Sequence, residues 1–76
     1  MCKELVEYIV KTLVEQPDQV QVAIEDAPEI RLQLRVGPGD LGRVIGKQGR
    51  NARAIRTLLH AAAARQKRRV NLQIIE

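Results

Sequence analysis

Four stretches of the chain carry apolar residues at the spacing of a regular element. Over residues 3–15 the apolar positions recur every three to four residues, which predicts an amphipathic helix. Over residues 19–26, 30–36 and 69–75 apolar and polar residues alternate, which predicts strands with one buried face. The turn residues Ala27-Pro28-Glu29 separate the first two strands, so we expect these strands to form an antiparallel hairpin.

Two further helices are predicted between the second and third strands. The first covers residues 41–46, with Asp40 as its expected N-cap. The second covers residues 50–65, and at about 100° per residue its apolar residues share one face. That core face carries Ala52, Ile55, Leu59, Ala62 and Ala63, and the opposite face carries Arg50, Arg53 and Thr57. The order helix, strand, strand, helix, loop, helix, strand predicts one α+β domain over residues 1–76, with three helices covering one face of a three-stranded sheet.

The loop Gly46-Lys47-Gln48-Gly49 joins these two helices. Its glycines permit a tight bend and let another backbone approach closely. The N-terminus of the following helix offers unpaired N–H groups and a partial positive charge, both of which suit a phosphate. Lys47 and Arg50 add full positive charges there. The loop therefore predicts a binding site for a phosphodiester backbone.

The charge of the chain is divided unequally between its two halves. Residues 1–40 carry four basic and eight acidic residues, a net charge of −4, whereas residues 41–76 carry nine basic residues and one acid, a net charge of +8. A basic half of this kind indicates a polyanionic partner, and the alternative is a solvated basic face. With 76 residues the domain has a small core, so a second chain that covers apolar surface would stabilise it.

Other chemistries fit the sequence poorly. Residues 37–42 match the dinucleotide fingerprint G-x-G-x-x-G, but no acid follows about 20 residues later and the chain is too short for that fold. The loop is not a P-loop, because Gln48 rather than Ser or Thr follows Lys47. His60, expected at the surface, and Cys2 form no metal-ligand pattern, and the basic half contains no paired carboxylates and no nucleophile–base arrangement. We therefore expect no enzyme activity, no catalytic residue, no metal and no cofactor.

The content of cysteine, aromatic and apolar residues indicates the cellular compartment and the kind of binding surface. A single cysteine excludes an internal disulfide and fits the reducing cytoplasm. The sequence also lacks the run of about 18 apolar residues that is needed to span a membrane. Tyr8 is the only aromatic residue, which argues against base stacking on a sheet of aromatic side chains. The sequence instead favours a groove with aliphatic walls and backbone groups.

Residues 42–50, with the sequence Gly-Arg-Val-Ile-Gly-Lys-Gln-Gly-Arg, resemble the signature of a KH domain. In such domains the G-x-x-G loop clamps the backbone of about four nucleotides. The element order resembles the type II arrangement found in bacteria. The length of the chain and the segment Ala54-Ile55-Arg56-Thr57 are similar to the small single-KH proteins of the KhpA family. Asn51 stands where such a domain is expected to carry an apolar residue.

The resemblance implies a function and partners. It implies binding of single-stranded RNA with broad specificity, by a cytoplasmic post-transcriptional regulator or RNA chaperone. It also implies pairing with a second copy or with a larger KH protein of the KhpB (Jag) type. Two alternatives remain open: a KH factor associated with the ribosome or with transcription, and a protein-interaction module that has lost RNA binding.

The expected RNA contacts fall into three groups. Lys47, Gln48 and the loop N–H groups are expected to hold the sugar-phosphate backbone, and three arginines are expected to add charge around it. Three apolar residues are expected to form a wall for the bases. The full expected set is Leu41, Arg43, Val44, Ile45, Gly46, Lys47, Gln48, Gly49, Arg50 and Arg53.

Helix 50–65 also carries a second strip of residues beside its core face. The strip consists of Ala54, Leu58, Ala61, Ala62 and Arg65. Leu58 lies at the edge of the core face and is expected to be half covered, while Ala54 and Ala61 are small enough to let a second helix approach. We therefore expect self-association through this helix. The alternative is a helix that is rich in alanine for its helix propensity alone.

Overall fold

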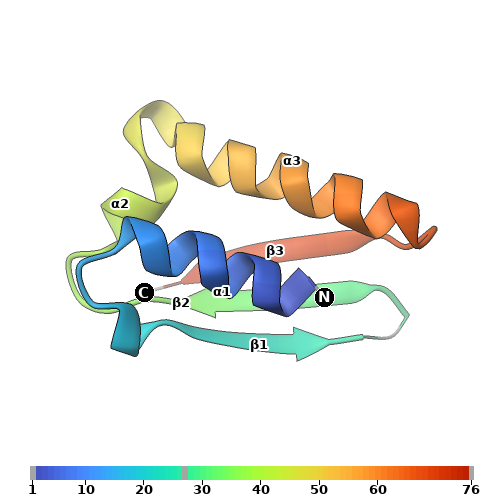
Figure 1. The fold of residues 1–76 in the computed structure, drawn as a ribbon, viewed down its shortest axis with the longest axis horizontal. Helices are drawn as coiled ribbons and strands as arrows, with labels where there is room; N and C mark the ends of the chain where they lie inside the picture. Colours follow the sequence, from blue (N-terminus) through green and yellow to red (C-terminus); the bar gives the residue numbers. More distant parts are fainter. Residues whose placement is uncertain (1, 27, 76) are drawn as a thin grey trace.

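Three α-helices and three strands make up the fold in the computed structural model, which describes residues 2–26 and 28–75 (Figure 1). In chain order they are α1 (Cys2–Leu13), β1 (Gln21–Glu25), β2 (Ile30–Arg35), α2 (Leu41–Ile45), α3 (Arg50–Arg65) and β3 (Val70–Ile75). Two single 3-10 turns, η1 (Pro17–Gln19) and η2 (Lys47–Gly49), precede β1 and α3. The predicted α+β class and the predicted order of elements are confirmed.

The sheet has the strand order β1-β2-β3, with β2 in the centre. β1 runs antiparallel to β2, with Val22 opposite Leu34, which confirms the expected hairpin. Ala27 of the predicted turn lies outside the described residues. β3 runs parallel to β2, and the pairing extends from Ile30 opposite Val70 to Arg35 opposite Ile75.

One face of the sheet is covered by helices and the other is open. In β2 the side chains alternate between buried and exposed, so Ile30, Leu32 and Leu34 point into the core. α1 and α3 pack against each other over this face, and the short α2 lies at one end of the helical layer (Figure 1). The buried residues of α3 are Ala52, Ile55, Leu59 and Ala63, as predicted, while Ala62 is only partly buried. At the sheet edge, Ile24 of β1 stays 43% exposed.

Helix α1 ends at Leu13, two residues before the predicted end. The cause is Asp40, whose carboxylate accepts hydrogen bonds from the backbone N–H groups of Glu15 (3.1 Å) and Gln16 (3.0 Å). Pro17 then opens η1, so β1 begins at residue 21 rather than 19. The other predicted boundaries differ from the structure by one residue or agree with it.

The prediction that Asp40 caps α2 is correct for its position and wrong for its side chain. The Asp40 carbonyl oxygen accepts hydrogen bonds from the N–H groups of Arg43 and Val44, as expected at an N-cap. The carboxylate makes no capping bond to α2 and is turned toward the chain after α1 instead. Asp40 is 2% exposed, and the N–H groups of Glu15 and Gln16 satisfy its buried oxygens.

Candidate nucleic-acid interface

The Gly46–Gly49 segment forms a tight turn between α2 and α3. The N–H of Gly46 donates to the carbonyl of Gly42 (2.8 Å), and the N–H of Gly49 donates to the carbonyl of Gly46 (3.1 Å). Gln48 has a φ of 58°, a left-handed conformation that costs an ordinary residue free energy. Strained backbone of this kind is concentrated at ligand-binding sites, which draws attention to this turn.

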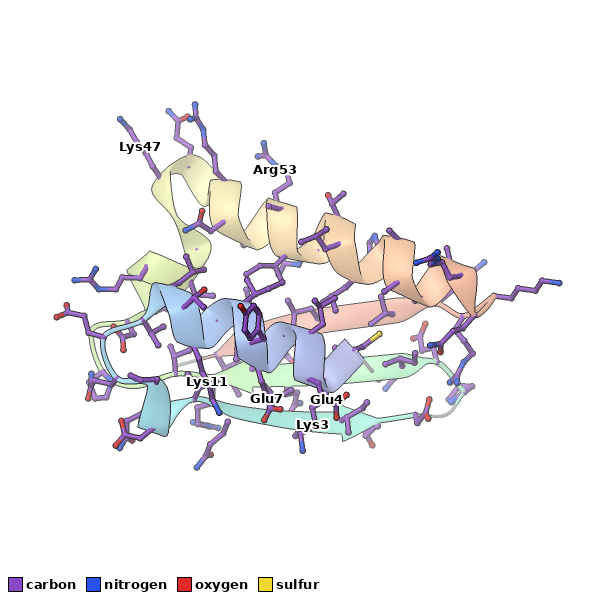
Figure 2. The ribbon with its side chains drawn as sticks, in the orientation of Figure 1. Lys3, Glu4, Glu7, Lys11, Lys47 and Arg53 are labelled. Carbon is purple, nitrogen blue, oxygen red and sulfur yellow. The ribbon has the colours of Figure 1, made fainter. Side chains whose placement is uncertain are left out.

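Three basic side chains surround the turn and remain exposed: Lys47, Arg50 and Arg53. Lys47 and Arg53 point away from the body of the domain on the same side (Figure 2). Within residues 2–26 and 28–75 no acidic side chain pairs with any of the three. Their charges are therefore free to attract an anion.

A hollow of about 560 Å³ lies beside the turn, between α3 and β3. Aliphatic side chains from α2, α3 and β3 line one part of it, and polar side chains of α3 line the rest. The lining residues are Ile45, Gly49, Ala52, Arg53, Arg56, Thr57, His60 and Ile74. The hollow thus combines aliphatic walls with four polar side chains, and among its lining residues only the His60 imidazole is aromatic.

Five of these lining residues were not among the predicted contacts: Ala52, Arg56, Thr57, His60 and Ile74. The spacing of Arg53, Arg56 and His60 is that of one helix face, so a search for the face that continues from the turn could have found them. His60 is exposed, as predicted, but it borders the hollow. Ile74 carried no such signal, because the alternation in β3 does not show which strand β3 joins.

Two residues of the predicted apolar wall do not line the hollow. Val44 is fully buried in the core, so its side chain cannot contact a base. Leu41 is partly buried and packs against the same core. The reason is that α2 has only five residues and uses its apolar side chains to attach itself to the domain. Ile45 alone of the three reaches the hollow.

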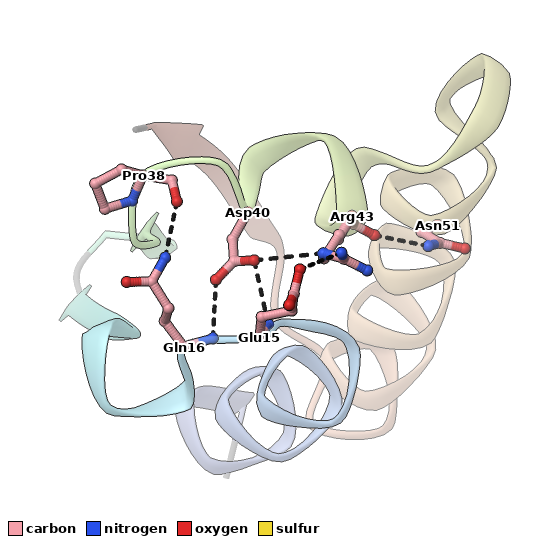
Figure 3. Close-up of polar contacts among 6 residues, drawn as sticks. All are labelled: Glu15, Gln16, Pro38, Asp40, Arg43 and Asn51. Atoms are coloured by element: carbon pink, nitrogen blue, oxygen red, sulfur yellow. Dashed lines mark hydrogen bonds and ion pairs between the residues drawn. The ribbon is translucent and has the colours of Figure 1, made fainter.

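Arg43 was predicted to add charge around the RNA, but its guanidinium is already occupied. It forms an ion pair with the Glu15 carboxylate, and its Nε lies 3.6 Å from Oδ1 of Asp40 (Figure 3). Arg43 is also absent from the lining of the hollow. Its side chain therefore fastens α2 to the segment after α1 and contributes little free charge to the site.

The second strip of α3 lies on the surface, apart from Ala62. Ala54, Ala61 and Arg65 are exposed, and Leu58 is 51% exposed, close to the expected half coverage. A shallow hollow of about 470 Å³ lies at the N-terminal end of this strip, lined by Arg50, Arg53, Ala54, Thr57 and Leu58. The strip thus presents an apolar surface next to the basic turn.

The described residues hold no group of three or more His, Cys, Asp or Glu side chains that could bind a metal ion. Among the same residues no helix has both the length and the apolar character needed to cross a membrane.

A β-α-α-β core with a G-x-x-G turn between its helices places the chain in the class of KH domains. The family model "KhpA/KhpB, KH domain" matches residues 3–74. The RNA-binding protein KhpA of Halalkalibacterium halodurans is 51% identical over 75 residues, which cover 97% of this chain and 99% of the relative. KhpA of Clostridium acetobutylicum is 51% identical over 74 residues, covering 96% and 99%. KhpA of Aquifex aeolicus is 48% identical over 75 residues, covering 97% and 95%.

The chain therefore belongs to the KhpA/KhpB family of KH domains. This is a family of binding domains, and the chain is not an enzyme. No solved structure matches the chain.

Proposed function

We propose that the protein holds single-stranded RNA through the Gly46–Gly49 turn, with broad specificity, in the cytoplasm. The observation that carries the proposal is the tight turn with unpaired basic side chains beside a hollow that has both aliphatic and polar lining residues. The names of the KhpA relatives, which describe them as RNA-binding proteins, support the same conclusion. Broad binding of this kind would suit a post-transcriptional regulator or RNA chaperone, which is the role that we propose.

The chemistry of the site suggests how the strand is held. Phosphate oxygens lie at the N-terminal end of α3, whose partial positive charge favours an anion, and Lys47 and Arg50 supply full charges. The bases then lie in the hollow against Ile45 and Ile74. Contacts to phosphate and sugar position a strand without reading its sequence, which accounts for broad specificity.

The double variant Lys47→Asp/Gln48→Asp tests the proposal. Both side chains are exposed, and Asp adopts the left-handed backbone of position 48 more readily than most residues. The fold should therefore survive, while two anions stand where phosphate must lie. We expect the Kd for a fluorescent single-stranded RNA of mixed sequence, measured by anisotropy, to rise about tenfold or more.

The variant Lys11→Asp/Gln21→Asp is the matched control. It changes the same residue types and the same net charge at two exposed positions of α1 and β1. Lys11 lies on the opposite side of the domain from Lys47 (Figure 2). The control should bind RNA nearly as well as the original protein. Equal losses of affinity in the two variants, or none in either, would contradict binding at the turn.

We further propose that the protein pairs through α3 with a second copy or with a KhpB-type KH protein. The exposed Leu58 and the small exposed Ala54 and Ala61 support this proposal, because they let another helix approach closely. Two-fold pairing places the same surface of each copy against the other. The strip lies beside the RNA site without including the hollow between α3 and β3.

A further inference from the structure

Asn51, near the start of α3, makes a hydrogen bond across the base of the Gly46–Gly49 turn. Its side-chain Nδ2 donates to the carbonyl oxygen of Arg43, at 2.9 Å (Figure 3). That carbonyl belongs to the last turn of α2, where carbonyl groups lack partners within the helix. The bond therefore joins the end of α2 to the beginning of α3.

The same side chain also packs against the turn itself. A Cβ placed on Gly46 would lie 2.7 Å from Cγ of Asn51 and 2.9 Å from its Nδ2. The Asn51 amide thus occupies the space next to the Gly46 backbone. No such neighbour exists at Gly49, where a Cβ would meet nothing within 4 Å.

Further polar contacts fasten α2 from its other side. Arg43 pairs with Glu15 and Asp40, and Asp40 accepts hydrogen bonds from the N–H groups of Glu15 and Gln16 (Figure 3). A helix of five residues has little stability of its own, so its orientation depends on such contacts. The contacts run continuously from residues 15–16 through α2 to Asn51.

We infer that Asn51 is a positioning residue that holds the Gly46–Gly49 turn in the shape that binds RNA. This inference rests on the proposed function. Asn51 acts through the Arg43 carbonyl and the Gly46 backbone, and it fixes how Lys47 and Gln48 are presented. A ligand binds less tightly when the competent conformation of its site is only partly populated, in proportion to that population. The apolar residue expected at position 51 could not make this bond.

The variant Asn51→Leu removes the donor while keeping the charge and roughly the size of the side chain. The Kd for single-stranded RNA should rise by about three- to tenfold as alternative turn conformations become populated. The amides of Gly46 and Gly49 should exchange hydrogen faster, while exchange within α3 and the melting temperature change little. A residue with a purely structural role would instead lower the stability of the whole domain.

Gln73→Leu is the matched control, because it also replaces an amide with leucine. Gln73 lies on the open face of the sheet, where its Oε1 accepts an exposed hydrogen bond from Gln33 (3.3 Å). We expect unchanged RNA affinity and unchanged exchange in the turn. Asn51→Ala, which removes the amide without adding an apolar branch, is the second variant at position 51. Loss of the fold in both Asn51 variants would make Asn51 a stability residue and overturn the inference.

The results for the Asn51 and Lys47/Gln48 variants distinguish the positioning role of Asn51 from the proposed RNA-binding function. Unchanged exchange of the turn amides in folded Asn51→Leu overturns the positioning role. Faster exchange with unchanged RNA affinity also overturns it, provided that Lys47→Asp/Gln48→Asp binds weakly. If neither variant affects RNA affinity while exchange becomes faster, Asn51 still shapes the turn, and the proposed RNA-binding function is what fails.

Discussion

At the scale of single residues, the two glycines of the turn meet different requirements. Gly46 has φ 76° and ψ 171°, a region that only glycine populates, and a Cβ there would collide with Asn51. Gly49 has φ 77° and ψ 15°, with open space around it. We expect Gly46→Ala to lower the free energy of unfolding by about 2–4 kcal/mol and Gly49→Ala by about 1–2 kcal/mol, measured by urea denaturation.

Gly42→Ala is the control for this comparison. Gly42 lies within α2, has no positive φ, and offers space for a Cβ. Alanine at this position should raise the free energy of unfolding by about 0.5–1 kcal/mol. Equal losses for Gly46→Ala and Gly49→Ala would show that the contact with Asn51 does not constrain the turn.

The sequence located the turn but not the roles of its neighbours. Gly46 and Gly49 could be recognised because a local bend requires them. Arg43 appeared to be a free charge, because its partner Glu15 lies 28 positions away in the chain. The proposed role of Asn51 likewise depends on the Arg43 carbonyl, which becomes available only where α2 ends. Roles that depend on such contacts cannot be derived from local sequence.

At the scale of elements, α3 uses three of its faces. One faces the core, one lines the hollow, and the strip around Leu58 remains uncovered. Hydrophobic periodicity predicted the type and order of the elements, because each half-buried helix or strand repeats its apolar positions. It did not predict that β3 runs parallel to β2, since alternation defines a face and not a neighbouring strand.

The variant Leu58→Asp tests whether α3 forms an interface. Leu58 is 51% exposed, so a carboxylate there can reach solvent in a monomer but would be buried in a helix pair. We expect the unchanged protein to sediment as a dimer at micromolar concentration and Leu58→Asp to sediment as a folded monomer. Ala64→Asp, about 120° around the helix from Leu58, should remain dimeric. A monomeric unchanged protein, or a dimeric Leu58→Asp protein, would contradict pairing through this strip.

At the scale of the whole molecule, the charge is concentrated in the half of the chain that carries the turn. Residues 41–76 hold a net charge of +8, against −4 for residues 1–40. If three or four phosphates are neutralised, the logarithm of the RNA association constant should fall with the logarithm of salt concentration at a slope of roughly −2 to −3. This slope can be measured by anisotropy titrations of RNA binding at several salt concentrations. A slope near zero would mean that the basic half is only a solvated surface.

The parallel pairing of β2 and β3 has a consequence for the folding kinetics. Ile30 and Val70 are 40 positions apart, so their contact must close a long loop, whereas the β1–β2 hairpin forms through local contacts. Pairings between distant parts of a chain slow folding, and we therefore expect β3 to dock late. Ile74 of β3 lines one side of the hollow. The hollow beside the Gly46–Gly49 turn would therefore be completed only when this strand docks, so its wall depends on the slowest contact of the fold to form.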